Sequence, residues 1–331
     1  RTPFDDKRLP NKAEVVGVLV PAAGGGRQAI AFAASLLAKR PVTTTKVEGR
    51  SLVVVTTTRG ANRVYYAGDA TFAVRVSDDI VADADGEGAR TVSESPLPLM
   101  SPAWSPDGEW LAYVSFESHS SAIWLQRVRT GERRRLLARP GINGSPAFAP
   151  TRGDRLAVTL STVGGNRDIY VVALADGALT RVTSDPAIDT EAVFSPDGRS
   201  LYFTSDRAGS PQIYRAEALA NAPAKRMTFT GSYNARPRLS PDGKQLAMVT
   251  LAGGSYRVAV QDLATGVVRQ LTKGPLDESP SFAPNGAMLI YAGRDRGQGV
   301  LATVAIDGLT TQRLKADEGE VREPVWGPRR P

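Results

Sequence analysis

Short apolar segments recur along most of this chain, and each of them stops at a proline turn. An aromatic or large apolar residue lies two places before the proline in every copy: Trp104, Phe148, Phe194, Leu239, Phe282 and Trp326. Four copies continue as Pro-Asp-Gly or Pro-Asn-Gly. This is typical of a tight turn, because proline fixes φ and glycine accepts a positive φ. The pattern predicts a strand that ends at the turn.

A return strand and two further strands follow each turn. The predicted second strands cover residues 111–115, 156–160, 201–205, 246–250 and 289–293. Third strands are indicated at 168–172 and 212–216, and a fourth at 269–272 after a Thr-Gly turn. Four antiparallel strands in each copy are what one blade of a β-propeller contains.

The spacing of the copies sets the expected number of blades. The prolines lie 43 to 46 residues apart: Pro106, Pro150, Pro196, Pro241, Pro284 and Pro328. A period of about 40–45 residues is the signature of propeller blades. The sixth copy has only an innermost strand, so residues 64–67 and 72–76 are expected to supply its second and third strands. We therefore predict a mainly β, six-bladed β-propeller over residues 62–331, closed by pairing of N- and C-terminal strands.

Residues 1–61 lie outside the repeats and predict a small α/β domain. Strands are expected at 13–20 and 51–58, and a helix at 28–39, where apolar residues recur at helical spacing. The glycine-rich run at 23–27 is interpreted as the turn before this helix, because it lacks the Lys-Ser/Thr ending of a phosphate-binding loop.

Composition excludes several classes of function. The chain has no cysteine and a single histidine, His119, so neither a cysteine site nor a multi-histidine metal site is available. The net charge of +7 is dispersed, and the densest basic run, Arg133-Arg134-Arg135, has no aromatic platform beside it. No apolar run approaches the ~20 residues of a membrane span. We expect no metal, no cofactor, no nucleic acid and no membrane span.

The candidate site is the set of short connections that precede the innermost strands. In a propeller these connections converge on one mouth of the central channel, and here they are polar and carry both charge signs. The residues are Met100, Ser101, Asn143, Gly144, Ser145, Thr190, Glu191, Asn234, Ala235, Arg236, Glu278, Ser279, Arg322 and Glu323. They predict either a recognition surface or simply solvated loop tips.

Several motifs resemble the TolB family of periplasmic propellers. They are the run from Leu99 to Gly108 (LMSPAWSPDG), Phe203-Thr204-Ser205-Asp206-Arg207, Leu276-Asp277-Glu278-Ser279-Pro280, and the run from Arg322 to Pro328 (REPVWGP). The resemblance covers about residues 62–331. The α/β domain of TolB proteins is larger than residues 1–61, so we expect this domain to be either shortened or only partly contained in the sequence.

The resemblance implies a non-enzymatic, monomeric periplasmic protein of the Tol–Pal system, which supports outer-membrane integrity and cell division. Family members bind the lipoprotein Pal at the propeller mouth, and the matching positions here are Ile142, Asn143, Gly144, Ser145, Thr190 and Glu191. We add Asn234, Arg236, Glu278, Arg322 and Glu323 from their expected place at the mouth. An N-terminal segment, residues 1–10 here, would contact TolA.

An enzyme is the alternative from another class of function. Six-bladed propellers also serve as lactonases and sugar dehydrogenases, which use carboxylates or a metal at the channel mouth. Glu191, Glu278 and Glu323 are the three carboxylates that would hold a calcium ion in such a site. Against this alternative, that chemistry usually recruits histidines or a cofactor, and this mouth has no histidine.

Overall fold

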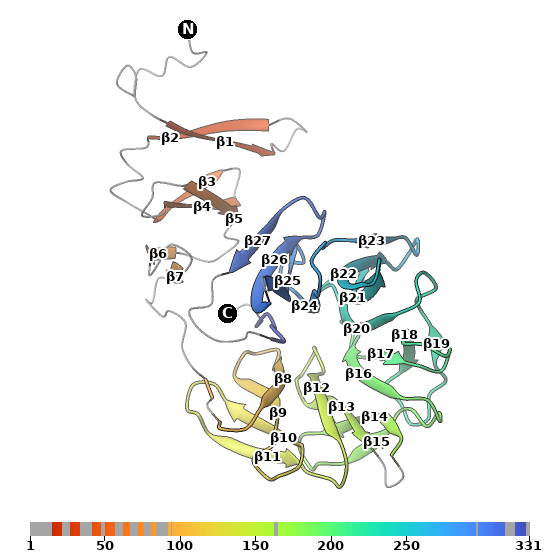
Figure 1. Ribbon diagram of the computed structural model, residues 1–331. Coiled ribbons are helices and arrows are strands. Elements are labelled where there is room, and N and C mark those ends of the chain that lie inside the picture. The colour runs from red at the N-terminus through yellow and green to blue at the C-terminus, as the bar shows by residue number, and fades with distance from the viewer. Residues whose placement is uncertain are drawn as a thin grey trace. The chain divides into compact units, whose positions relative to one another are not determined.

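The computed structural model divides the chain into two compact units, residues 1–91 and 92–331 (Figure 1). In the first unit the structure describes residues 15–21, 27–33, 42–47, 50–56, 62–66, 72–75 and 81–83. In the second it describes residues 92–93, 95–161, 165–295, 297–314 and 322–328. The expected domain boundary between residues 61 and 62 stays a prediction.

The described residues of the first unit are all strands. They are β1 (Val15–Pro21), β2 (Arg27–Ala33), β3 (Val42–Val47), β4 (Arg50–Thr56), β5 (Asn62–Tyr66), β6 (Phe72–Arg75) and β7 (Val81–Asp83). Antiparallel pairing gives the sheets β1-β2, β3-β4-β5 and β6-β7.

The helix predicted at 28–39 is wrong over its described part, because residues 27–33 form β2 and pair with β1. Ile30 and Phe32 alternate with alanines, and this apolar spacing fits a strand as well as a helix. A neighbouring β-branched segment at 15–20 offers a hairpin partner. Residues 34–39 lie outside the described residues.

The second unit is a β-propeller whose described residues form five four-stranded antiparallel blades around a channel (Figure 1). Blade 1 holds β8 (Leu99–Trp104), β9 (Trp110–Ser115), β10 (Ala122–Arg127) and β11 (Arg133–Leu137). Blade 2 holds β12 (Asn143–Phe148), β13 (Arg155–Ser161), β14 (Arg167–Ala173) and β15 (Leu179–Arg181). Blade 3 holds β16 (Asp189–Phe194), β17 (Ser200–Ser205), β18 (Gln212–Glu217) and β19 (Lys225–Arg226). Blade 4 holds β20 (Asn234–Leu239), β21 (Gln245–Ala252), β22 (Ser255–Asp262) and β23 (Val268–Gln270). Blade 5 holds β24 (Glu278–Phe282), β25 (Met288–Asp295), β26 (Gln298–Ala305) and β27 (Thr311–Leu314).

The prediction of six blades is therefore wrong, and so is the predicted closure by pairing of N- and C-terminal strands. The segments expected to complete a sixth blade, at 64–67 and 72–76, fall largely within β5 and β6 of the first unit. There they pair with β4 and β7, their neighbours in sequence. Hairpins between neighbours close short loops, which costs less chain entropy than pairing across the whole chain.

The sixth copy of the motif nevertheless touches both end blades. The backbone N–H of Trp326 donates to the Ser281 Oγ of β24 at 3.1 Å. On the other side, the N–H of Ser101 in β8 donates to the Glu323 carboxylate at 2.5 Å, and Gly327 packs against the Trp104 indole. Residues 322–328 thus lie between blades 5 and 1 without forming an assigned strand.

The core of the propeller lies between the sheets. In one cluster the fully buried Ile169 of blade 2 packs with Leu201 and Phe203 of blade 3. The Phe203 ring stacks on Tyr214, with ring centroids 6.3 Å apart. The second strand of blade 3 is buried on both faces, since every residue of β17 is buried. This double burial explains why the second strands read as continuous apolar runs.

The Ser-Pro-Asp-Gly turns have a repeated hydrogen-bond pattern. In the turn of blade 4, the Ser240 hydroxyl donates to Asp242 Oδ1 at 2.5 Å, and the same oxygen accepts from the N–H of Lys244 at 3.1 Å. The N–H of Gln245 donates back to Ser240 Oγ at 2.9 Å. In blade 5 Asn285 takes the place of the aspartate, and its Oδ1 accepts from the N–H of Ala287 at 3.0 Å.

Each inner strand carries a β-bulge near its start. In all five blades the register shifts there, for example between Gly144 and Ala147. One residue of each bulge has positive φ, and Glu323 repeats this conformation: Ser101 (52°), Ser145 (48°), Glu191 (58°), Arg236 (55°), Ser279 (55°) and Glu323 (50°). Positive φ costs a residue with a side chain about 1–2 kcal/mol, so the strain recurs at one place in every repeat.

The aspartate turns predict a pH dependence of stability. The Ser240 hydroxyl and the Lys244 N–H hold the pKa of Asp242 below its usual value, and Ser195 and Arg199 do the same for Asp197. A lowered folded-state pKa gives stability that is complete above the unfolded pKa of about 3.9 and is lost as the pH falls through the folded pKa. In the double variant Asp197→Asn/Asp242→Asn, the urea midpoint of unfolding should fall less than in wild type when the pH is lowered from about 5 to about 2. Asparagine is chosen because the turn of Asn285 shows that an amide keeps the hydrogen-bond geometry. An equal fall of the urea midpoint in variant and wild type would contradict this prediction.

The bulges predict opposite effects for two substitutions at Ser145. Glycine accepts positive φ without strain, so Ser145→Gly should leave the free energy of unfolding unchanged or raise it by up to about 1 kcal/mol. A β-branched residue is least tolerant of this conformation, so Ser145→Val should lower the same quantity by about 1–3 kcal/mol. Urea unfolding followed by tryptophan fluorescence measures both. Equal stability of the two variants would show that the backbone at Ser145 is unstrained.

Candidate functional site

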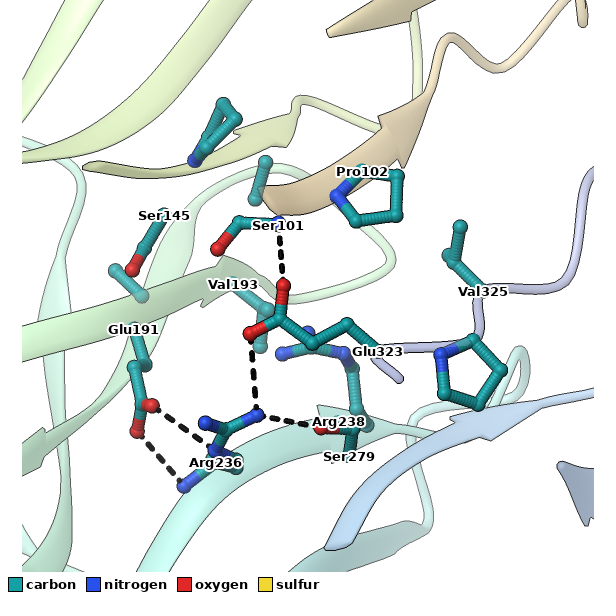
Figure 2. Close-up of a pocket in the computed structure, with 14 residues that line it drawn as sticks. Ser101, Pro102, Ser145, Glu191, Val193, Arg236, Arg238, Ser279, Glu323 and Val325 are labelled. Atoms are coloured by element: carbon teal, nitrogen blue, oxygen red, sulfur yellow. Dashed lines mark hydrogen bonds and ion pairs between the residues drawn. The ribbon is translucent and has the colours of Figure 1, made fainter. Parts of the chain in front are cut away.

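The positive-φ residues line the cavity at the centre of the propeller. The cavity wall consists of Ser101, Pro102, Ser145, Pro146, Ala147, Glu191, Ala192, Val193, Arg236, Arg238, Ser279, Glu323, Pro324 and Val325 (Figure 2). All six bulge positions contribute, so the repeated backbone conformation brings one side chain from each copy to the channel. The predicted residues Ser145, Glu191, Arg236 and Glu323 are thereby brought together.

Arg236 is the centre of a charged network across the cavity. Its Nε lies 3.2 Å from Glu191 Oε1, and its Nη1 lies 3.5 Å from Glu323 Oε1. The same Nη1 donates to Ser279 Oγ at 2.5 Å. Figure 2 shows the guanidinium between the two carboxylates. One side chain of blade 4 thus joins blade 3, blade 5 and the 322–328 segment.

The second oxygen of each glutamate holds the backbone of the next repeat. Glu191 Oε2 accepts from the N–H of Arg236 at 3.2 Å and from Thr204 Oγ1 at 3.1 Å. Glu323 Oε2 accepts from the N–H of Ser101. Bonds to a charged acceptor are stronger than neutral ones. Both carboxylates therefore act as links between neighbouring copies.

Arg238, two residues further along β20, faces the same cavity. Its Nη1 donates to the carbonyl oxygen of Pro237 at 2.8 Å. Burial lowers the pKa of Arg238, and this effect outweighs the attraction of Glu191 and Glu323. A fraction of its surface still faces the channel. The sequence analysis did not single out this arginine.

Two of the predicted site residues shape loops from inside the protein. Asn143 and Asn234 are fully buried. Asn143 Nδ2 donates to the carbonyls of Ser121 and Arg139 at 2.9 and 2.7 Å. Asn234 Nδ2 donates to Thr230 O at 2.8 Å. Their contribution to recognition would be indirect, because they set the conformation of the connections.

Two aspartates that were not predicted occupy the same repeat position. Asp189 is fully buried and pairs with both Oδ atoms to Arg207 Nη2, at 2.9 and 2.7 Å. The Asp277 carboxylate accepts from the N–H of Gly274 at 2.8 Å. The signal was available in the sequence, because an Asn or Asp stands two places before the bulge residue in four copies.

Five of the six copies carry a large apolar residue within the three places before the bulge residue, and we call this set the apolar rim. Three places before the bulge residue, successive copies carry Ile142, Ile188, Tyr233 and Leu276. Ile142 is 38% and Ile188 is 39% exposed, and Met100 is 43% exposed nearby in its own repeat. Of these residues only Ile142 was predicted as a partner contact. Exposed apolar side chains beside charged ones are typical of protein-binding surfaces.

The remaining predicted residues do not belong to the cavity wall. Gly144 and Thr190 are half-buried, and Arg322 is exposed. Glu278 is half-buried and does not belong to the cavity wall. Residues 1–10, expected to contact TolA, lie outside the described residues.

The three carboxylates of the enzyme alternative do not all line the cavity. Glu191 and Glu323 are held on opposite sides of Arg236, whereas Glu278 is not part of the cavity wall. The three carboxylates of the enzyme alternative are therefore not assembled into one site. Among the residues that the structure describes, no three His, Asp or Glu side chains are placed to share a metal ion, and no helix is long and apolar enough to cross a membrane.

Comparisons with known proteins give the family. The family model of the TolB β-propeller domain matches residues 53–330. The Tol-Pal system protein TolB of Bordetella pertussis is 47% identical over 249 residues, which are 75% of this chain and 56% of that protein. TolB of Xanthomonas oryzae pv. oryzae is 49% identical over 253 residues, 76% of this chain and 57% of that protein.

A solved structure agrees with these matches. The crystal structure of TolB from Acinetobacter baumannii superposes with a TM-score of 0.70 at 37% identity, covering 90% of this chain and 86% of that one. The chain spans a little over half the length of the curated relatives that it matches. The repeated motif, the propeller and these matches agree, and the chain belongs to the TolB family of Tol–Pal system proteins.

Proposed function

We propose that this chain is a periplasmic, non-enzymatic binding component of the Tol–Pal system whose propeller mouth binds the lipoprotein Pal. Family membership supports a role in that system. The observation that carries Pal binding is the combination of an apolar rim with a fixed, polar cavity at one end of the channel. Interfaces of specific complexes have this anatomy, with apolar anchors beside satisfied polar groups.

The rigidity of the mouth supports tight binding. Buried Asn and Asp side chains hold the connections, and the Glu191–Arg236–Glu323 network holds the inner strands. A surface that is already ordered loses little conformational entropy when a partner binds. The Pal-contact positions would then be Ile142, Gly144, Ser145 and Thr190 at the surface, with Asn143, Asn234 and Glu191 positioning them.

We further propose the wider role that the family resemblance implies. A Pal-bound state would be reported to TolA through residues 1–10, and the system would support outer-membrane integrity and cell division. Arg236, Glu278, Arg322 and Glu323 belong to the same proposed binding face. The protein would act as a monomer.

Alanine substitution at the mouth should weaken Pal binding. Ile142→Ala removes exposed apolar surface, and Thr190→Ala removes a hydroxyl that faces Thr159 Oγ1 at 3.4 Å. Each should raise the Kd for a Pal periplasmic domain by roughly 5- to 30-fold, which corresponds to about 1–2 kcal/mol. Isothermal titration calorimetry measures this. Glu191 is left intact because its removal would also disturb Arg236.

Leu309→Ala is the matched control. Leu309 is 85% exposed in the turn between β26 and β27. In the same turn, the N–H of Ile306 donates to the carbonyl of Ala287, which follows the proline turn at the end of the blade opposite the mouth. This variant should bind Pal like wild type. If the two mouth variants also bind like wild type, the Pal site lies elsewhere. If wild type itself does not bind Pal, the proposed function is wrong.

A further inference from the structure

Arg238 is a half-buried cation in the wall of the channel, and no described acidic side chain forms an ion pair with it. A guanidinium offers five N–H donors. Within the described part of the chain, Arg238 makes one hydrogen bond, to the carbonyl of Pro237, and forms no ion pair. Partial burial removes part of the hydration of the guanidinium, which is costly for a charge without a partner. Something else in the channel must satisfy this group, either water or a ligand.

The charged groups around Arg238 are already engaged with one another. Glu191, Glu323 and Arg236 are the groups that interact with it electrostatically. Arg236 binds a carboxylate oxygen of each glutamate, and the remaining oxygens accept from backbone N–H groups. The two glutamates attract Arg238 from a distance but give it no direct hydrogen bond.

The propeller fold does not require an arginine at this position. Two places after the bulge residue, the other copies have small or aliphatic side chains: Ala103, Ala147, Val193, Ser281 and Val325. Arg238 is the one charged residue among the six equivalent positions. The inner strands of the other four blades build the same bulge without an arginine at this position, so the bulge does not require the charge of Arg238.

We propose that Arg238 is an anion-binding residue of the channel, which binds a carboxylate group. A carboxylate matches the planar fork of a guanidinium, which can donate two parallel hydrogen bonds to it. The Ser101 and Ser145 hydroxyls line the same cavity and offer further donors. The negative charges of Glu191 and Glu323 disfavour ligands with more than one charge. The ligand is therefore a monocarboxylate, either free in solution or on an acidic side chain of a partner at the mouth.

Thermal unfolding of the full 331-residue chain tests this inference with sodium acetate as the probe. In chloride-free buffer near pH 7, acetate at about ten times its Kd should raise the Tm of wild type by roughly 3–5 °C. Arg238→Met should abolish this shift. Without acetate, that variant should melt no lower than wild type, because a half-buried charge without an ion-pair partner has been replaced by an apolar side chain of similar length.

Two more variants keep the test specific. Arg134→Met removes an exposed arginine of β11, and it should retain the acetate shift. Arg238→Lys keeps the charge but loses the fork, and it should retain a smaller shift. An acetate shift that persists in Arg238→Met would overturn the inference. So would the absence of any shift in wild type.

Competition with Pal distinguishes the two sources of the carboxylate. If Pal supplies it, saturating acetate should raise the Kd for Pal in wild type but not in Arg238→Met. If the anion is free, acetate should raise the Tm and leave the Kd for Pal unchanged. Both results support an anion site, and neither requires that the proposed Pal function be correct, because the Tm measurement uses no Pal.

Discussion

The left-handed residue at the start of each inner strand is the constraint on which the propeller site depends. It bends the strand at a bulge and turns one side chain from each copy toward the channel. Bulges typically redirect side chains in this way next to functional sites. Because the bend recurs in every copy, the site is built by repetition, and its chemistry is set by what each copy places at that position.

Glu191, Glu323 and Arg236 link the repeated copies to one another around the channel. A carboxylate on one copy binds the backbone of the next, and the guanidinium joins three parts of the ring. Half-buried charges of this kind are stabilising only when they are well matched. They are matched here with backbone donors as well as with each other, so the centre of the channel is held in one arrangement.

Much of the fold was predictable from the sequence, and the errors have identifiable causes. The turns at Pro106, Pro196 and Pro241 gave the period and the strand order, because Pro-Asp-Gly chemistry is local. The predicted number of blades was wrong because the proline motif identifies only an innermost segment. It does not show which strands pair with that segment. The helix predicted at 28–39 was wrong because the spacing of Ile30 and Phe32 fits the alternation of a strand as well as the period of a helix.

The candidate site was predictable in its location more than in its roles. Ser145, Glu191, Arg236 and Glu323, which were expected where the inner connections converge, line one cavity. The depth of each side chain was not predictable, so Asn143 and Asn234 were expected at the surface although they are buried. Arg238 was missed because it stands out as the one charged residue at its repeat position only when all six copies are compared.

The bond between Ser101 and Glu323 joins residues that are 222 positions apart in the chain. Such a contact has a large entropic cost of loop closure, and it forms only after nearly all of the propeller has been synthesised. The blades can each fold from local hairpins as they emerge, but the channel remains open at the junction of blades 1 and 5. The complete channel wall is therefore a late product of folding, and a chain still in synthesis would lack it.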